Sequence, residues 1–213
     1  MRMKSDGICN FCKGTVSGTG MTRHLQSCAS RMQAQAREKK QGKVFLMKAS
    51  AGPFWIYFDA DGSSTLKKVD SFLRDLWLEC CGHLSAFIIG DVHYASQPQQ
   101  EYGDRSMNVA LEKVLTPSLE FIHEYDYGTT TQLSLKCISV RTSKAEGSIN
   151  ILARNNLPEF ACVECGKPAK EICSQCEGDG LLCKLCSKKH ECGEDMFLPV
   201  VNSPRTGVCG YTG

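Results

Sequence analysis

The chain has 213 residues, 14 of them cysteine, and a formal net charge of +2. This length allows one ordinary hydrophobic core within one or two domains. The basic opening stretch MRMKSDGIC lacks the apolar run of an export signal, and no apolar stretch reaches the ~18 residues of a membrane span. We therefore expect a cytoplasmic protein with no membrane partner, whose cysteines persist as thiols or thiolates rather than disulfides.

Charge and cysteine are unevenly distributed along the chain. Residues 1–48 carry a net charge of +8, residues 49–159 carry −5 and residues 160–213 carry −1, while eight of the cysteines lie beyond residue 160. This asymmetry indicates separate functional segments. The expected division is a zinc finger at 1–30, a basic helical linker at 31–42, an α+β core at 43–158 and a two-zinc domain with a C-terminal wrap at 159–213.

The N-terminal segment ICNFCKGTVSGTGMTRHLQSC has the ligand spacing of a short zinc site. Cys9 and Cys12 form a CxxC pair, and His24 and Cys28 lie four apart, which places them on one face of a helix. The segment resembles the ββα zinc finger, with Cys in place of the last His and one residue missing from the loop. So short a unit needs metal binding to supply its folding energy.

A basic run follows this finger, and we expect the finger helix to continue through ASRMQAQAREKKQGK. Coupled to a finger, its charge favours contact between residues 1–48 and nucleic acid, whereas the alternative is a solvated linker helix. One finger reads only about three base pairs, so strong sequence specificity is not expected. The candidate nucleic-acid contacts are Arg23, Arg31, Arg37, Lys39, Lys40 and Lys43.

The middle of the chain reads as mixed strands around one strong helix, which predicts an α+β domain. Apolar residues recur at helical spacing over 65–81, with Ser63, Ser64 and Thr65 as candidate N-caps. Two strands with the turn DADG precede this helix, and a buried strand, a hairpin and a last strand follow it. The expected strands are 43–50, 54–62, 83–90, 119–127, 131–141 and 148–155.

The phrases FLRDLWLECCGHLSAF and HEYDYGTTTQLSLK resemble a family first noted as an open reading frame of a root-inducing plasmid. The same family is known as the passenger protein of an insertion element and carries a resolvase-style label. The likeness covers roughly residues 43–155. It departs from the commoner pattern at Thr129 to Gln132, where an Asp and a Trp usually follow the turn. The resemblance implies a link to mobile elements, but no recombinase serine motif supports the label.

Few polar residues of the core suggest catalysis. Asp59 and Asp61 could bind a cation, but a hairpin turn or a strand–helix turn is the preferred explanation of DADG. Asp91 and His93 are spaced as an acid/base pair but lack a third partner. These four residues are the support for the alternative function, a metal-dependent hydrolase or nuclease of the mobile-element type.

Other chemically reactive residues of the core have structural explanations. We expect His83 and His123 to be core or edge histidines with their own partners. At least one of Cys80 and Cys81, close to Trp77, is expected to be a small buried hydrophobe.

The C-terminal segment ACVECGKPAKEICSQCEGDGLLCKLCSKKHEC concentrates eight Cys and His residues. Three closely spaced CxxC pairs argue against a redox centre, and the absence of an export signal argues against disulfides. Iron on four thiolates is the chemical rival, but the His favours zinc, and eight ligands fit two ions. Neighbouring pairs could share an ion, or alternate pairs could interleave.

This tail resembles B-box-type fingers. The resemblance implies that Cys162, Cys165, Cys183 and Cys186 hold one ion, and that Cys173, Cys176, His190 and Cys192 hold the other. The close His190-x-Cys192 spacing leaves Cys209 as a substitute last ligand. Such fingers generally serve in protein interaction or packing.

The sequence as a whole therefore predicts a non-enzymatic adaptor holding three zinc ions. We expect its N-terminal finger to touch nucleic acid through charge, and its C-terminal finger to contact a protein partner or pack on the core.

Overall fold

The computed structural model describes residues 5–39, 41–143, 147–176 and 180–213. Its larger sheet contains β1 Asp6–Cys9, β2 Thr15–Ser17, β3 Lys43–Ala51, β4 Phe54–Asp61, β5 Ser85–Ile89, β6 Val92–Ala95, β7 Arg105–Ser106, β8 Glu120–Tyr125, β9 Thr131–Thr142 and β10 Ile149–Asn155. Its smaller sheet contains β11 Glu171–Cys173, β12 Leu181–Leu182 and β13 Phe197–Pro199. The helices are α1 Met21–Ser27, α2 Ala29–Ala36, α3 Leu66–Leu73, α4 Leu111–Val114 and α5 Lys184–Ser187, with single turns η1 Arg74–Leu78, η2 Gln100–Tyr102 and η3 Glu194–Met196.

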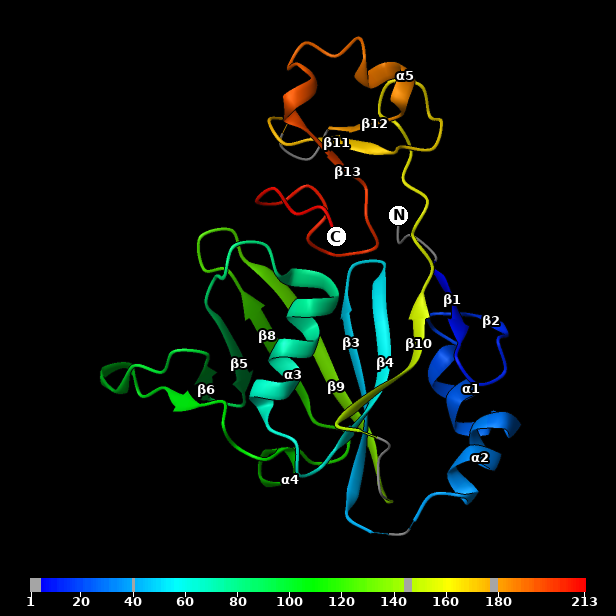
Figure 1. The fold of residues 1–213 in the computed structure, drawn as a ribbon, viewed down its shortest axis with the longest axis vertical. Helices are drawn as coiled ribbons and strands as arrows, with labels where there is room; N and C mark the ends of the chain where they lie inside the picture. The colour runs from blue at the N-terminus through cyan, green and yellow to red at the C-terminus, as the bar shows by residue number, and fades with distance from the viewer. Residues whose placement is uncertain (1–4, 40, 144–146, 177–179) are drawn as a thin grey trace.

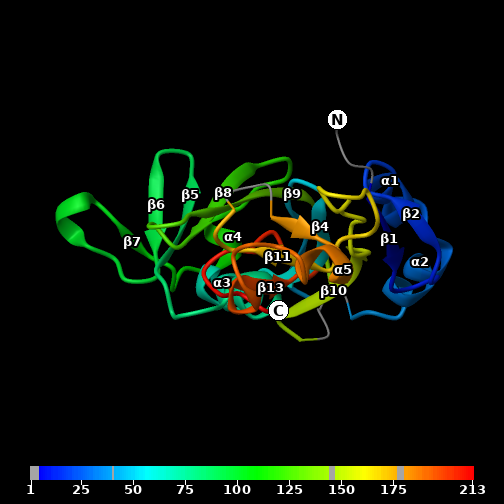
Figure 2. The ribbon, with the colours of Figure 1, turned by 90° about the horizontal axis from the view of Figure 1, so that it is seen from above.

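The ten strands of the larger sheet follow the order β2-β1-β10-β4-β3-β9-β8-β5-β6-β7 (Figure 1). Neighbouring strands are antiparallel except β6 and β7, which are parallel. Seen from above, the N-terminal finger and the β6–β7 extension lie at opposite ends of this sheet, and the small sheet lies over its middle (Figure 2). The architecture is α+β, as the sequence predicted.

Strand β4, with the sequence FWIYFDAD, is buried on both of its faces. Side chains alternate along a strand, so Ile56 and Phe58 face α3 and the main core, whereas Trp55 and Tyr57 face the finger. Asp59 continues the second face. The continuous apolar run therefore serves two cores, one on each side of the sheet.

The β3–β4 hairpin turns at Gly52 and Pro53, with Ala51 paired to Phe54. Of the two turns expected for DADG, the structure has the strand–helix turn and not the hairpin turn: Asp59 to Asp61 end β4, and Gly62 begins the link to α3. The carboxylate of Asp61 accepts hydrogen bonds from the backbone N–H and hydroxyl of Ser63 and so shapes the link to α3.

Helix α3 begins where the sequence indicated. Thr65 is its N-cap, and its hydroxyl accepts a hydrogen bond from the backbone N–H of Lys68 at 3.3 Å. Leu66, Val69 and Leu73 are buried in the main core, and the helix continues into the π-helical turn η1 before the chain bends at Cys80. Figure 1 shows α3 lying against one face of the sheet.

The finger strands continue the main sheet. β1 pairs with β10, so that Gly7 is opposite Asn155 and Cys9 is opposite Ala153. Met21 and Leu25 of α1 are buried against Trp55 on the finger-facing side of the sheet. The finger is thus built onto the core rather than standing apart from it.

The finger helix does not continue through the basic run as expected. It ends at Cys28, whose ψ of 112° is extended, and α2 starts anew from that residue. Helix α2 ends at Ala36, before most of the basic residues. The break arises because Cys28 leaves the helical conformation at the position where its thiol joins the finger ligands.

After β13 the chain returns to the core, and the segment 200–213 lies between the small sheet and the large one (Figure 1). Ser203 donates a hydrogen bond to the carbonyl of Trp77 at 2.6 Å, and the amide of Asn202 donates to the carbonyl of Asn155 at 2.8 Å. Arg205 is fully buried. Within the described ranges, no helix has the length and apolar character needed to cross a membrane.

Candidate metal centres

The first candidate centre, which we term the head group, consists of Cys9, Cys12, His24 and Cys28. Their sulfur and ring nitrogen atoms all lie within 4.8 Å of one another. Cys9 ends β1, and the backbone N–H of Lys13 donates to the carbonyl of Cys9 at 2.8 Å, which closes the turn that carries Cys12. His24 comes from α1, and its Nε2 lies 3.4 Å from the Cys12 Sγ. The structure brings together the four residues proposed from the spacing.

The second centre, tail group I, joins Cys162 and Cys165 to Cys183 and Cys186, again within 4.8 Å. The Sγ atoms of Cys165 and Cys183 are 3.7 Å apart. Burial opposes ionisation of Cys162, but the backbone N–H groups of Cys183 and Cys165 lower the pKa of its thiol to about 6. The thiols of Cys165 and Cys183 raise the pKa of Cys186 to about 12. A divalent cation between these sulfurs would remove their mutual repulsion.

The third centre, tail group II, joins Cys173 and Cys176 to His190 and Cys192 within 4.8 Å. The Cys176 Sγ lies 3.3 Å from His190 Nε2 and 3.8 Å from the Cys192 Sγ. Although burial opposes it, backbone N–H groups of Gln175 and Cys176 lower the pKa of Cys173 to about 7. The neighbouring Cys192 and Cys173 raise the pKa of Cys176 to about 11.

The two tail groups interleave along the chain, because tail group I uses the first and third CxxC pairs. These are the same sets that the B-box resemblance implies. Cys192, not Cys209, completes tail group II. The short His190-x-Cys192 spacing is therefore no obstacle to a four-ligand group.

The separations between the ligand atoms fit a tetrahedral ion. With Zn–S near 2.3 Å and Zn–N near 2.0–2.1 Å, two sulfurs on one zinc lie about 3.8 Å apart, and a sulfur and a nitrogen about 3.6 Å apart. The observed pairs span 3.3–3.8 Å. All fourteen cysteines are free thiols. The chain thus holds Cys and His groups that could bind metal ions at both ends.

Sequence reasoning missed one further group. Cys80, Cys81, His83 and Cys209 also place their ligand atoms within 4.8 Å of one another. His83 was expected to be a core or edge histidine, and Cys209 a substitute in the tail. At least one of Cys80 and Cys81 was expected to be a small buried hydrophobe, which is corrected, because Cys80 is half-buried and Cys81 is exposed. No spacing rule could find this group, because Cys209 lies 126 residues from His83 in sequence.

The candidate nucleic-acid contacts are placed unequally. Arg23, Arg37 and Lys39 are exposed, and exposed Lys43 lies 3.9 Å from Glu112. Arg31 is only 5% exposed. Its guanidinium faces Asp59, so the expectation that Arg31 contacts phosphate is corrected. Lys40 lies outside the described residues.

The residues proposed for catalysis are dispersed. Asp59 is buried and ion-paired with Arg31 at 3.5 Å and Arg141 at 2.8 Å. Asp91 and His93 are exposed at the β5–β6 hairpin, and no candidate metal group among the described residues includes either of them. Asp59 therefore has a structural role in binding two arginines.

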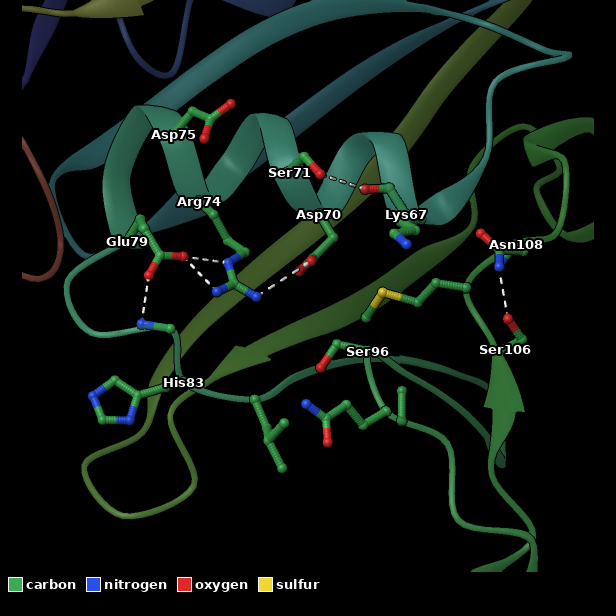
Figure 3. Close-up of a pocket in the computed structure, with 15 residues that line it drawn as sticks. Lys67, Asp70, Ser71, Arg74, Asp75, Glu79, His83, Ser96, Ser106 and Asn108 are labelled. Carbon is green, nitrogen blue, oxygen red and sulfur yellow. Dashed lines mark hydrogen bonds and ion pairs between the residues drawn. The ribbon is translucent and has the colours of Figure 1, made fainter.

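His123 is a core histidine, as expected. It is fully buried, and its Nε2 lies 2.7 Å from the Asp70 carboxylate. Asp70 also lines a cavity of about 490 Å³ between α3 and the loops around β6 and β7 (Figure 3). Arg74 also lines this cavity, and its guanidinium forms ion pairs with Glu79 at 2.5 Å and with Asp70 at 3.8 Å. The carboxylates of Asp70 and Glu79 thus serve in ion pairs with Arg74.

No family model and no curated protein matches the chain. Among solved structures, the crystal structure of MM3350, a protein of unknown function from Methanosarcina mazei Go1, is similar with a TM-score of 0.43 and 15% sequence identity. The similarity covers 53% of this chain and 68% of that chain. It carries no inference about activity.

Proposed function

We propose that the protein is a non-enzymatic adaptor that holds zinc in the head group, tail group I and tail group II. The observation that supports this is that each group completes four soft ligands from two short segments. Four protein ligands close the coordination sphere, which is the arrangement of structural rather than catalytic zinc. Imidazole in two of the three groups favours zinc over an iron–sulfur cluster.

The zinc assignment is tested by metal analysis of the reduced full-length chain and of single-ligand variants. We expect Cys12→Ser, Cys165→Ser and Cys192→Ser each to lose one zinc per chain relative to wild type. Cys137→Ala is the control, because Cys137 is buried in the main core and belongs to none of the metal groups. A metal-free wild-type chain that is folded and cross-linked through sulfur would overturn the proposal.

We propose that the N-terminal finger and the basic segment after it bind nucleic acid. Arg23, Arg37 and Lys39 are exposed on the finger and the segment after α2, and Lys43 is partly neutralised by Glu112. With about three phosphate contacts, affinity should fall about 40-fold between 50 and 200 mM salt. Binding of this kind depends on charge and not on base sequence.

The matched experiment reverses three charges in the full chain, either on the finger and the segment after α2 or at exposed sites elsewhere. Arg23→Glu with Arg37→Glu and Lys39→Glu should abolish binding to a short duplex at 50 mM salt. The control, Lys68→Glu with Arg105→Glu and Lys113→Glu, makes the same change in net charge at exposed sites away from the finger. Equal loss in both variants would contradict a finger-specific interface.

The tail is proposed to contact a protein partner. Val163 and Leu185 lie beside ligands of tail group I and are 51% and 66% exposed, respectively. Large apolar side chains on a small, rigid finger are suited to a protein interface. The link to mobile elements rests on the resemblance to the plasmid reading-frame family and stays a prediction.

A further inference from the structure

We propose a fourth metal site, formed by Cys80, Cys81, His83 and Cys209, that fastens the C-terminal segment to the core. It goes beyond the three zinc sites of the proposed function. The Nε2 of His83 lies 3.3 Å from the Cys209 Sγ, and all four ligand atoms fall within 4.8 Å of one another. Three thiols and one imidazole are a ligand set for zinc.

The backbone around Cys80 and Cys81 is shaped so that consecutive side chains can serve one ion. The helical turn η1 ends at Leu78, the chain bends at Cys80 and Cys81, and Gly82 has a φ of +74°. The Glu79 carboxylate accepts a hydrogen bond from the Gly82 backbone N–H at 2.7 Å. A left-handed glycine in this turn brings His83 back toward the two cysteines.

Tyr125 holds this loop from the core side. Its hydroxyl accepts hydrogen bonds from the backbone N–H groups of Cys80 at 3.4 Å and His83 at 3.3 Å, and it donates to Glu79 at 3.2 Å. Tyr125 is fully buried at the end of β8. The loop that carries three of the ligands is therefore positioned by a rigid strand.

Cys209, near the C-terminal end of the chain, reaches the loop that carries the other three ligands with an unfavourable backbone conformation. Its φ is +50°, a region that residues other than glycine seldom adopt. Gly207 and Gly210 on either side also have positive φ values. A non-glycine residue held in this way is typical of functional positions, where the surrounding structure offsets the strain. Here the conformation directs the Cys209 thiol to His83.

The surroundings of His83 support metal binding rather than simple thiol pairing. Its Nδ1 lies 3.6 Å from the Asp126 carboxylate, while its Nε2 faces Cys209. A histidine that binds metal through one ring nitrogen commonly directs the other to a carboxylate. Asp126 is itself fixed by Arg205, whose Nε donates to the Cys80 Sγ at 3.4 Å. A disulfide would give no role to this histidine and its carboxylate.

Four protein ligands leave no open position, so the site is structural. It would join the bend after η1 to the last residues of the chain, near the Glu79 and His83 wall of the cavity in Figure 3. The C-terminal segment is thus held at Arg205 by an ion pair and at Cys209 by a metal.

The test is native mass spectrometry of the reduced full-length chain, with wild type compared to Cys209→Ser and His83→Ala. We expect wild type to carry four zinc ions and each variant to carry one fewer. The controls are Cys137→Ala and His93→Ala, a buried cysteine and an exposed histidine outside every group, which should keep the wild-type count. Cobalt substitution of wild type should add the visible bands of a fourth tetrahedral thiolate site, which Cys209→Ser loses.

The difference in zinc content between wild type and Cys209→Ser tests this site alone, whatever the total zinc content of wild type. A loss of one zinc in Cys209→Ser supports the fourth site even if the head group or a tail group proves empty. An empty head or tail group would count against the proposed function instead. Equal zinc counts in wild type and Cys209→Ser would overturn the fourth site. So would a Cys81–Cys209 disulfide, found by peptide mapping in wild type protected from air.

Discussion

The guanidinium of Arg31 lies 3.5 Å from the carboxylate of Asp59, in the buried seam between the finger and the sheet. Its Nη1 also donates to the carbonyl of Leu25 at 2.9 Å. Burial lowers the pKa of Arg31, and the nearby Asp59 opposes that shift. A residue of the basic run therefore serves to dock the finger.

Arg31→Ala should destabilise the protein without weakening nucleic-acid binding by the folded chain. Removing one member of a buried ion pair costs roughly 3–5 kcal/mol, but Arg141 still compensates Asp59, so we expect about 2 kcal/mol. Urea denaturation measures this change. Arg37→Ala is the matched control, because Arg37 is exposed in the same segment. It should weaken nucleic-acid binding and leave the free energy of unfolding unchanged. If Arg31→Ala weakened binding and left stability unchanged, the docking role would be wrong.

Gly7→Ala should loosen the finger from the sheet. A Cβ at Gly7 would overlap the carbonyl oxygen of Arg154 and the ring of Trp55, so the backbone would have to move. We expect a loss of about 2–3 kcal/mol from this overpacking, with altered Trp55 fluorescence.

Gly128→Ala provides the comparison for Gly7→Ala. A Cβ there would meet only the Asp126 carboxylate, at 3.4 Å, which is ordinary contact. Its urea midpoint should stay close to wild type. Equal midpoints for the two variants would show that β1 is not tightly seated on β10.

Removal of metal by a chelator should unfold the C-terminal finger before the rest of the protein. The small sheet has only three short strands, and its buried apolar cluster is Cys162, Leu182 and Cys183, whereas the main core is much larger. Because metal binding supplies the folding energy of such units, hydrogen exchange should accelerate across 160–199 while β3, β4 and β9 stay protected. Uniform loss of protection after chelation would contradict this independence. Cys137→Ala should respond to chelator as wild type does.

Asp70→Ala should destabilise the core through His123. The Nδ1 of His123 is buried and has no hydrogen-bond partner among the residues that the structure describes, so loss of Asp70 leaves neither ring nitrogen with a partner there. We expect a cost of about 2–3 kcal/mol, measured by urea denaturation.

Asp75→Ala is the control for Asp70→Ala, because Asp75 is exposed and points away from Arg74 in Figure 3. Its urea midpoint should match wild type. Similar midpoints for the two variants would show that the buried His123–Asp70 contact contributes little.

Local spacing was enough to predict the head and tail groups, because a CxxC pair and a helical His-x3-Cys bring their ligands together within a few residues. The N-cap of α3 and the alternating pattern of the strands could also be predicted, because both depend on residues close in sequence. The role of Arg31 could not be predicted, since its burial depends on Asp59, which lies 28 residues away in sequence. The break at Cys28 was missed for a related reason. Helix propensity favours continuation, but the ψ of 112° at Cys28 redirects the following chain into α2, where Arg31 meets Asp59.

Strand β4 has a consequence for how the protein can be altered. Its odd-numbered and even-numbered side chains belong to different hydrophobic layers, so inserting one residue within it would exchange the contents of the two layers. The finger could not be moved to another scaffold as an independent unit, because strands of the main sheet supply about half of its buried apolar cluster. The finger and the main core therefore share the backbone of β4, and a change in its register would alter both.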